Sequence, residues 1–266
     1  MIIKLASLFF LMSMALAVVP GNSLFPSAYA SADQQYTREQ LVTMYPGFYF
    51  YRGSSEAKKV ALTFDDGPDD QVTPQILDIL KDNSVKGTFF LIGSYASLHP
   101  DIVRRIAAEG NVIANHTWSH PNMARLSPAQ AREEIAKTEN LLRQTTGYRT
   151  ALLRPPKGRV STSIMDLAQK EGYRVIGWSV DSADWRDPQA ARIATRLHNQ
   201  IHPGAIILMH AVAFPKNQGS TVKVLPALIK ELKAQGYQLV TIDELLHIPV
   251  YGSLQPNTIT RRDPAF

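Results

Sequence analysis

The sequence predicts an α/β fold, a (β/α) barrel with about seven parallel strands. Short apolar runs typical of strands alternate with stretches whose apolar residues recur at every third or fourth position, as on one face of a helix. Repeated strand–helix–strand units imply parallel strands joined by crossover helices. The alternative is an open doubly wound sheet, but no glycine-rich phosphate loop follows the first strand. We therefore favour the barrel, complete or incomplete.

The strand pattern and the helix pattern follow each other along most of the chain. The strand-like runs are residues 60–64, 87–92, 112–115, 151–154, 174–180, 205–209 and 238–242. The stretches TPQILDILKDN and PDIVRRIAAEG have helical spacing. Ser127 and Pro128 are typical of a helix N-terminus. Glycines typical of helix C-termini are Gly110, Gly147, Gly172 and Gly236.

Residues 1–30 are predicted to be a secretory signal peptide. Lys4 precedes an apolar or small-residue run over residues 5–19, and the segment Ala28-Tyr29-Ala30 offers small residues for cleavage. An uncleaved membrane anchor is the alternative, but the run is shorter than the ~20 apolar residues that a span needs. We expect cleavage near Ala30 and a secreted protein, extracellular or associated with the cell wall.

The rest of the chain is predicted to have three parts. Residues 31–57 form an N-terminal segment that leads into the fold and contains the aromatic stretch YPGFYFYRGSS. Residues 58–248 hold the predicted barrel and its site. Residues 249–266 form a proline-containing polar tail, which we expect to be peripheral.

Composition limits the chemistry and the partners. The chain has 266 residues and no cysteine, so any metal must bind to His, Asp or Glu. The formal net charge of +5 suits an anionic cell-wall partner. No basic run with interleaved aromatic residues predicts nucleic-acid binding. Nothing in the sequence predicts a coiled coil or a partner helix, so we expect a monomer without a stable protein partner.

The stretch VALTFDDGPDD places four carboxylates directly after an apolar strand. Asp69 and Asp70 are explained as caps of the helix that begins near Val72. Asp65 and Asp66 are not, because like charges repel and each is costly to desolvate. A cation next to this pair would offset both effects.

The stretch NHTWSHP contains His116 and His120, four residues apart. On a helical turn both imidazoles would face the same way and could chelate one ion. With a strand-end carboxylate they would form a two-histidine, one-carboxylate set, which leaves positions for water and substrate. Zinc, iron, cobalt or manganese fits such a set.

Further polar residues follow other strands, and in a barrel all strand C-termini meet at one rim, where active sites lie. Arg154 ends the fourth strand, and an arginine there would keep a second aspartate ionised and oriented. Asp181 ends the fifth strand, with Asp184 and Trp185 close behind. His210 ends the sixth, and beside Asp181 it would be a polarised proton donor.

Together these pieces resemble the polysaccharide deacetylase family, metal-dependent carbohydrate esterases that include chitin and peptidoglycan deacetylases. Five motifs carry the resemblance in the family's order, from about residue 58 to residue 246. They are TFDDGP (63–68), HTWSH (116–120), RPP (154–156), DSADW (181–185) and LMH (208–210).

The resemblance implies a deformed (β/α) barrel with the active site at its C-terminal rim. It implies a divalent metal, zinc in first place with cobalt, iron or manganese as alternatives, bound by Asp66, His116 and His120. Asp65 would be the general base, held by Arg154, and His210 the general acid, its pKa tuned by Asp181. The expected substrate-binding residues are Pro155, Pro156, Lys157, Trp185 and Leu208, the last two lining a pocket for the acetyl methyl group.

Lys157 departs from the family pattern, in which tyrosine often follows the two prolines. Lysine keeps the backbone N–H that in the family serves the oxyanion, but its side chain is a cation. A cation here resembles the subgroup that deacetylates N-acetylmuramic acid on the way to the muramic δ-lactam, where arginine is usual. Lys157 would then meet the lactyl carboxylate. The alternative, a lysine that points to solvent, stays open.

The main hypothesis is hydrolysis of N-acetyl groups on an extracellular aminosugar polymer. Peptidoglycan, as N-acetylmuramic acid or N-acetylglucosamine, comes before chitin and chitooligosaccharides. A glycosidase needs two carboxylates about 5–10 Å apart and no metal, which leaves the two histidines unexplained. A two-histidine, one-carboxylate oxygenase is less consistent with strand-end Arg154 and His210 in a secreted chain. An inactive cell-wall-binding module is the alternative outside the enzymes.

Overall fold

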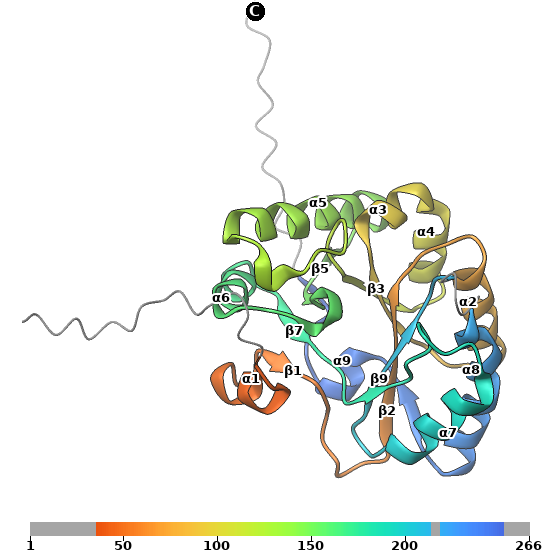
Figure 1. The fold of residues 1–266 in the computed structure, drawn as a ribbon. Helices are drawn as coiled ribbons and strands as arrows, with labels where there is room; N and C mark the ends of the chain where they lie inside the picture. Colours follow the sequence, from red (N-terminus) through yellow and green to blue (C-terminus); the bar gives the residue numbers. More distant parts are fainter. Residues whose placement is uncertain (1–35, 214–218, 253–266) are drawn as a thin grey trace, which may run out of the picture. The chain divides into compact units, whose positions relative to one another are not determined.

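The computed structural model describes residues 36–213 and 219–252, all within one compact unit (Figure 1). The predicted signal peptide and residues 253–266 of the predicted tail lie outside them. A parallel sheet with strand order β1-β7-β6-β4-β3-β2-β9-β8 forms the centre, and β10 also pairs with β2. The strands of this sheet are β1 (Tyr49–Phe50), β2 (Lys59–Asp66), β3 (Thr88–Leu91), β4 (Val112–Asn115), β6 (Leu152–Leu153), β7 (Arg174–Ile176), β8 (Val180–Asp181), β9 (Ile206–His210) and β10 (Gln238–Val240). The predicted α/β fold, a deformed barrel of parallel strands, is confirmed.

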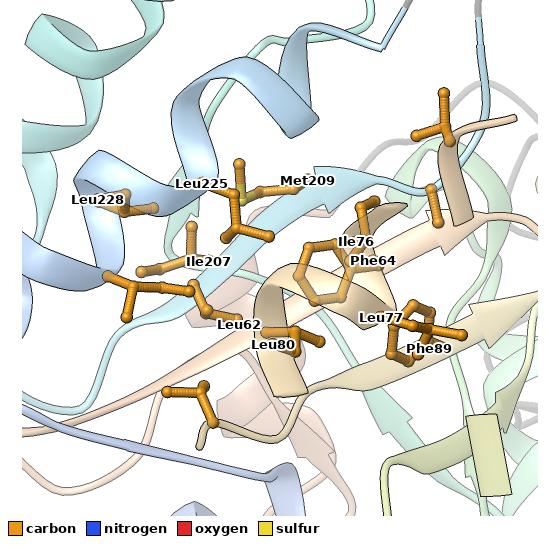
Figure 2. Close-up of a cluster of buried hydrophobic side chains, with 14 of the residues drawn as sticks. Leu62, Phe64, Ile76, Leu77, Leu80, Phe89, Ile207, Met209, Leu225 and Leu228 are labelled. Atoms are coloured by element: carbon orange, nitrogen blue, oxygen red, sulfur yellow. The ribbon is translucent and has the colours of Figure 1, made fainter. Parts of the chain in front are cut away.

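Strand β2 is the centre of the sheet and of the larger hydrophobic core. Its apolar residues alternate in direction, as in any strand, so that Leu62 and Phe64 pack against the surrounding helices. Figure 2 shows both side chains among residues of α2 (Val72–Asp82), α8 (Ser220–Ala234), β3 and β9. Phe64 stacks on Phe89 with ring centroids 4.9 Å apart. Ala61 lies in a separate interior cluster, and Asp65, four residues on, shares its face of the strand.

Helices surround the sheet on the outside (Figure 1). Besides α2 and α8 they are α3 (Gly93–Leu98), α4 (Pro100–Ala108), α5 (Pro128–Thr146), α6 (Thr162–Lys170) and α7 (Ala190–Gln200). Helix α9 (Ile242–Leu246) packs instead in the interior cluster with Ala61. The predicted start of α5 is confirmed: Ser127 caps it and forms a reciprocal capping box with Gln130. Its predicted end is confirmed too, because Gly147 is the C-cap with φ +81°. Asp69 Oδ1 accepts hydrogen bonds from Val72 N and Thr73 N at the start of α2, as expected for a capping acid.

Several predicted strands are shorter or divided. The run 174–180 forms β7 and β8, separated by residues 177–179; β8 ends the sheet order on one side and β7 is next to last on the other. The run 151–154 contributes only the two residues of β6. Just before β6, β5 (Arg149–Thr150) pairs antiparallel with β11 (Tyr251–Gly252) in a second, small sheet. Periodicity over a continuous apolar run does not reveal such breaks.

The segment expected to lead into the fold contributes to the sheet itself. Helix α1 (Arg38–Met44) precedes β1, and β1 pairs with β7 at the edge of the main sheet. The aromatic residues Tyr45, Phe48 and Tyr49 are buried in a core cluster with residues of α6 and β7. These rings show no strand or helix period, yet their burial ties the segment to the domain. None of the helices within residues 36–213 and 219–252 is long and apolar enough to cross a membrane.

Candidate active site

The C-terminal ends of the strands meet at one cavity of about 490 Å³. Asp65 and Asp66 end β2, and His210 ends β9, where it is paired in register with Asp65. The residues that line the cavity are Asp65, Asp66, His116, His120, Lys157, Arg159, Trp178, Asp181, Trp185, Leu208 and His210. Arg154 lies behind Asp65 and is completely buried. The expected convergence of the strand ends is thus what the structure shows.

Asp66, His116 and His120 form a set that can hold a metal ion. Their ligand atoms all lie within 4.8 Å of one another. Oδ1 of Asp66 is 3.4 Å from Nε2 of His116 and 3.4 Å from Nε2 of His120. The same Oδ1 is buried without a hydrogen-bond partner, which is costly for a carboxylate oxygen. A bound divalent cation would satisfy this oxygen, so the residues fit the metal that the sequence predicts.

The tautomer of His116 also suits a metal ligand. Its Nδ1 lies 2.6 Å from the backbone carbonyl oxygen of Arg154, which can only accept a hydrogen bond. Nδ1 therefore carries the proton, and the lone pair on Nε2 faces Asp66. Hydrogen bonds of this kind orient metal-binding histidines and raise their basicity.

The electrostatics of this set favour a positive charge. Burial opposes ionisation of Asp66, but the charge of His116 in its protonated form, with further charge from His210 and His120, lowers its pKa to about 2. Burial likewise opposes protonation of His116, yet the carboxylates of Asp65 and Asp66 raise its pKa. Burial and the neighbouring His116 lower the pKa of His120, which keeps that ring neutral and able to coordinate.

Backbone strain is concentrated around the cavity. Asp66, Thr117, His120 and Lys157 have φ values of +74°, +68°, +59° and +60°, in the left-handed region that non-glycine residues rarely adopt. Such conformations cost about 1–3 kcal/mol each and persist only where the surroundings enforce them. Their concentration at one rim marks it as a functional site.

Arg154 holds Asp65 as the sequence analysis expects. Its Nη1 donates to Asp65 Oδ1 at 2.6 Å and to Thr63 Oγ1 at 2.9 Å. Its Nε and Nη2 donate to the carbonyl oxygens of Ile176 and Gly177, at 3.1 and 3.0 Å. The guanidinium, fixed in one orientation, leaves Asp65 Oδ2 facing His116 Nε2 at 3.6 Å.

The carboxylate beside His210 is Asp184 and not Asp181, which corrects the sequence analysis. Nδ1 of His210 lies 2.7 Å from Asp184 Oδ1, and the backbone N–H of His210 donates to Asp184 Oδ2 at 2.9 Å. Asp181 lines the cavity and accepts a hydrogen bond from Ala183 N at 2.8 Å. Ala183 has φ +53°, so the chain turns back after β8 and brings the Asp184 carboxylate next to the His210 ring. A left-handed alanine has no signal in the sequence.

Asp184 sets the charge of His210. Asp184 is completely buried, and burial opposes its ionisation, but the charge and hydrogen bonding of His210 with a hydrogen bond from Thr221 lower its pKa. Burial in turn opposes protonation of His210, but the charge and hydrogen bonding of Asp184, with the charges of Asp66 and Asp65, raise its pKa to about 9. His210 is therefore protonated at neutral pH, as a proton donor must be.

The remaining predicted substrate residues are divided between the cavity and its support. Trp185, Leu208 and Lys157 line the cavity, and the Trp185 side chain is 46% exposed. Pro155 and Pro156 are buried and lead into the turn that carries Lys157. Two lining residues were not singled out in the sequence: Trp178, inside a predicted strand, and Arg159, in a loop.

The fold and the site thus define a deformed (β/α) barrel whose rim carries a set of residues that can hold a metal, a carboxylate bound by an arginine and a histidine paired with a buried aspartate. The family model described as polysaccharide deacetylase matches residues 52–176. A peptidoglycan-N-acetylglucosamine deacetylase of Bacillus cereus is 42% identical over 197 residues, which are 74% of this chain and 71% of that protein. The chain belongs to the polysaccharide deacetylase family.

Other relatives agree with this assignment. The peptidoglycan-N-acetylmuramic acid deacetylase PdaA of Bacillus subtilis is 33% identical over 210 residues, 77% of each chain. The crystal structure of the Bc1960 peptidoglycan N-acetylglucosamine deacetylase has a TM-score of 0.77 and 38% identity, and the match covers 81% of this chain and 99% of that one. BA3943 of Bacillus anthracis, a CE4 family pseudoenzyme, has a TM-score of 0.69 and 34% identity over 74% of this chain and 68% of its own.

Proposed function

We propose that the protein hydrolyses N-acetyl groups of an extracellular aminosugar polymer, with peptidoglycan as the first candidate. The observation that carries the proposal is one cavity that combines a metal-binding set, a carboxylate held by a buried arginine and a protonated histidine. The peptidoglycan deacetylases among the relatives support the substrate class. Chitooligosaccharides are the alternative, because a relative of that name is 34% identical over 205 residues.

Asp66, His116 and His120 would hold a divalent cation, zinc in first place. Such a cation polarises the acetamide carbonyl and lowers the pKa of water from 15.7 towards about 7. Asp65 is the residue placed to accept the proton of the attacking water, because Oδ2 faces the metal-binding set while Oδ1 is bound by Arg154. The bond formed is the one between the water oxygen and the acetyl carbon.

His210 supplies the other proton. As the carbon–nitrogen bond breaks, the departing amine nitrogen takes the proton from Nε2 of His210, whose Nδ1 is held by Asp184. The products are acetate and a free amino sugar. The backbone N–H of Lys157 is proposed to donate to the oxyanion of the tetrahedral intermediate, a contact typically worth roughly 10²–10³ in rate. Trp185 and Leu208 would enclose the acetyl methyl group.

The Lys157 side chain gives a reason to consider N-acetylmuramic acid before N-acetylglucosamine. It is exposed at the cavity, and no hydrogen bond or ion pair within residues 36–213 and 219–252 occupies its ammonium group. A lactyl carboxylate would meet this charge. Comparing Lys157→Ala with the unsubstituted protein on both sugars tests the idea, since a loss of activity confined to the muramic substrate is expected.

The function is tested by acetate release from purified protein, with and without a chelator. The substrates are acetylated chitooligosaccharides and peptidoglycan glycan strands from which the peptides have been removed. We expect release from the glycan strands that stops when the chelator removes the metal and returns when zinc is added. Release from chitooligosaccharides alone would reverse the order of the two substrates.

An inactive cell-wall-binding module is the candidate outside the enzymes, and BA3943 shows that such a loss occurs in similar structures. Every predicted catalytic position of this chain carries a competent residue type, which favours the enzyme. Binding of zinc and of glycan strands without any acetate release would favour the module.

We also propose that the protein is secreted, on the basis of the predicted signal peptide. N-terminal sequencing of the protein from the culture medium or the wall fraction should give Ser31 as the first residue. A chain that still begins with residues 1–30 and stays in the membrane fraction would contradict the prediction.

A further inference from the structure

The loop between the two metal-binding histidines, residues 117–119, is held from outside by two elements. On one side its carbonyl groups accept hydrogen bonds from α3. Gly93 N donates to Thr117 O at 2.9 Å, and Ser94 N donates to Trp118 O at 3.0 Å. These contacts use backbone atoms only, so no side-chain substitution removes them.

On the other side, one carboxylate accepts three hydrogen bonds from Trp118 and Ser119, while Thr117 N donates to Asn115 Oδ1 at 2.9 Å. Oε2 of Glu134, on α5, accepts hydrogen bonds from Trp118 N at 2.9 Å and from Ser119 N at 2.8 Å. Oε1 of the same side chain accepts a hydrogen bond from Ser119 Oγ at 2.8 Å. Hydrogen bonds to an ionised acceptor are stronger than those between neutral groups. Glu134 therefore couples α5 to the backbone of this loop, while Lys137, also on α5, contacts only the Trp118 ring, with Nζ 3.9 Å from its centre.

The loop needs such support because its backbone is strained at both ends. Thr117 and His120 have φ values of +68° and +59°. Residues other than glycine rarely adopt such φ values unless the surroundings enforce them. Without the three hydrogen bonds of Glu134 we expect the loop to relax and the ring of His120 to move away from Asp66.

The two histidines differ in how much they depend on the loop. His116 directly follows β4, its side chain is 2% exposed, and Arg154 O fixes its ring. The side chain of His120 is 27% exposed and lies at the far end of the loop. Loss of the loop contacts should therefore weaken one ligand and leave the other two in place.

We propose that Glu134 is a positioning residue for the metal site, acting through His120. It does not touch the metal or the substrate; it fixes residues 117–119 so that Nε2 of His120 faces Oδ1 of Asp66. This role rests on the metal site of the proposed function.

The test is zinc affinity of the metal-free protein, measured by calorimetry or by competition with a chelator. Loss of a partner that orients a metal ligand typically weakens metal binding roughly tenfold to a hundredfold, and we expect this for Glu134→Ala. Glu134→Gln keeps one acceptor oxygen and should lie between that variant and the unsubstituted protein. In the metal-free protein, the amides of Trp118 and Ser119 should exchange hydrogen faster in Glu134→Ala.

Two controls on the same helix separate positioning from charge and from general stability. Glu133 is exposed, and Glu133→Gln should leave zinc affinity unchanged. Glu139 is buried and accepts hydrogen bonds from Thr150 N at 3.0 Å and Tyr173 OH at 3.2 Å. Glu139→Gln should lower the unfolding temperature without changing zinc affinity.

Unchanged zinc affinity and unchanged exchange in a folded Glu134→Ala protein would overturn the proposal. So would an equal loss of affinity in Glu139→Gln, because the effect would then reflect general destabilisation. Absence of zinc binding by the unsubstituted protein would instead reject the metal site itself, and with it this role of Glu134.

Discussion

Two ion pairs lie at the cavity, and the buried partner has the opposite charge in each. In the pair Arg154–Asp65, at 2.6 Å, the cation is buried and the anion faces the cavity. In the pair Asp184–His210, at 2.7 Å, the anion is buried and the histidine faces the cavity. In each pair the partner behind holds the residue that lines the cavity. In the proposed reaction Asp65 accepts a proton and His210 donates one.

In each pair, substitution of the residue that reacts and of the residue that holds it should have different effects. A buried charge without its partner is strongly unfavourable, and both Arg154 and Asp184 are completely buried. Substituting a supporting residue should therefore affect stability as well as rate. Substituting a reactive residue by its neutral isostere should lower the rate most, because the proton transfer is lost. It should also lower stability, because the buried partner loses its counter-charge.

The largest expected effect is that of Asp65→Asn. Asparagine keeps the shape but cannot accept the proton of the attacking water, so turnover should fall by about 10²–10⁴. Zinc affinity should stay close to that of the unsubstituted protein, because Asp66, His116 and His120 are intact. The measurement is acetate release at saturating substrate together with zinc titration. An Asp65→Asn protein that remains fully active would show that another group is the base.

Arg154→Ala tests the supporting residue on the same side. It removes the guanidinium that donates to Asp65 Oδ1 and lies 3.9 Å from the centre of the Phe90 ring. Breaking a buried ion pair by removing one partner typically costs about 3–5 kcal/mol of unfolding free energy. The free energy of unfolding, measured with a denaturant, and kcat should both decrease. An exposed arginine, Arg104, provides the control, since Arg104→Ala should change neither. Kinetics unchanged in Arg154→Ala would mean that Arg154 does not orient the base.

The Arg154–Asp65 pair was predictable from the sequence, because the parallel sheet determines where both residues lie. An apolar run specifies a buried strand, and parallel strands place their C-termini at one edge. The register then pairs Asp65 with His210 and Asn115 with Leu153, so that residues directly after each strand become neighbours. Arg154, His116 and Asp66 were assigned from their positions at such ends.

The aspartate on the histidine side was not predictable, because it depends on a turn. Asp181 ends β8 and Asp184 follows three residues later, so both candidates stand at the rim in the sequence. The left-handed Ala183 and the hydrogen bond from Ser182 Oγ to Asp184 Oδ1, 2.9 Å, select the second. Likewise, β1 and β11 pair with strands that are distant in the sequence, β7 and β5, and the local hydrophobic pattern does not predict such pairing.

The pH dependence of stability tests the Asp184–His210 pair in the metal-free protein. The folded-state pKa of His210, about 9, lies above the unfolded value of about 6.5. A raised pKa means that the contribution is fully present below about pH 6.5 and is lost as the pH rises through about 9. The loss amounts to about 3 kcal/mol. The stabilisation that comes from Asp184 depends on pH in the opposite direction, because its pKa is lowered: it is lost as the pH falls into the acid range.

The measurement is the free energy of unfolding between pH 6 and pH 10, with a chelator present. His210→Gln is the control, because it cannot titrate and should flatten the decrease over this range. An identical pH dependence in both proteins would contradict the raised pKa of His210.

The smallest expected effect separates the two aspartates. Asp184→Asn keeps an acceptor near Nδ1 of His210 but removes the negative charge, so the pKa of His210 should fall from about 9 towards its ordinary value. Burial, which opposes the imidazolium, and the charges of Asp66 and Asp65, which favour it, then set the remaining pKa. Asp181→Asn, three residues earlier at the same rim, should leave that pKa unchanged. NMR titration of the His210 ring in the metal-free protein measures it directly. A larger shift in Asp181→Asn than in Asp184→Asn would restore the sequence-based assignment and show that the turn at Ala183 does not select the partner of the acid.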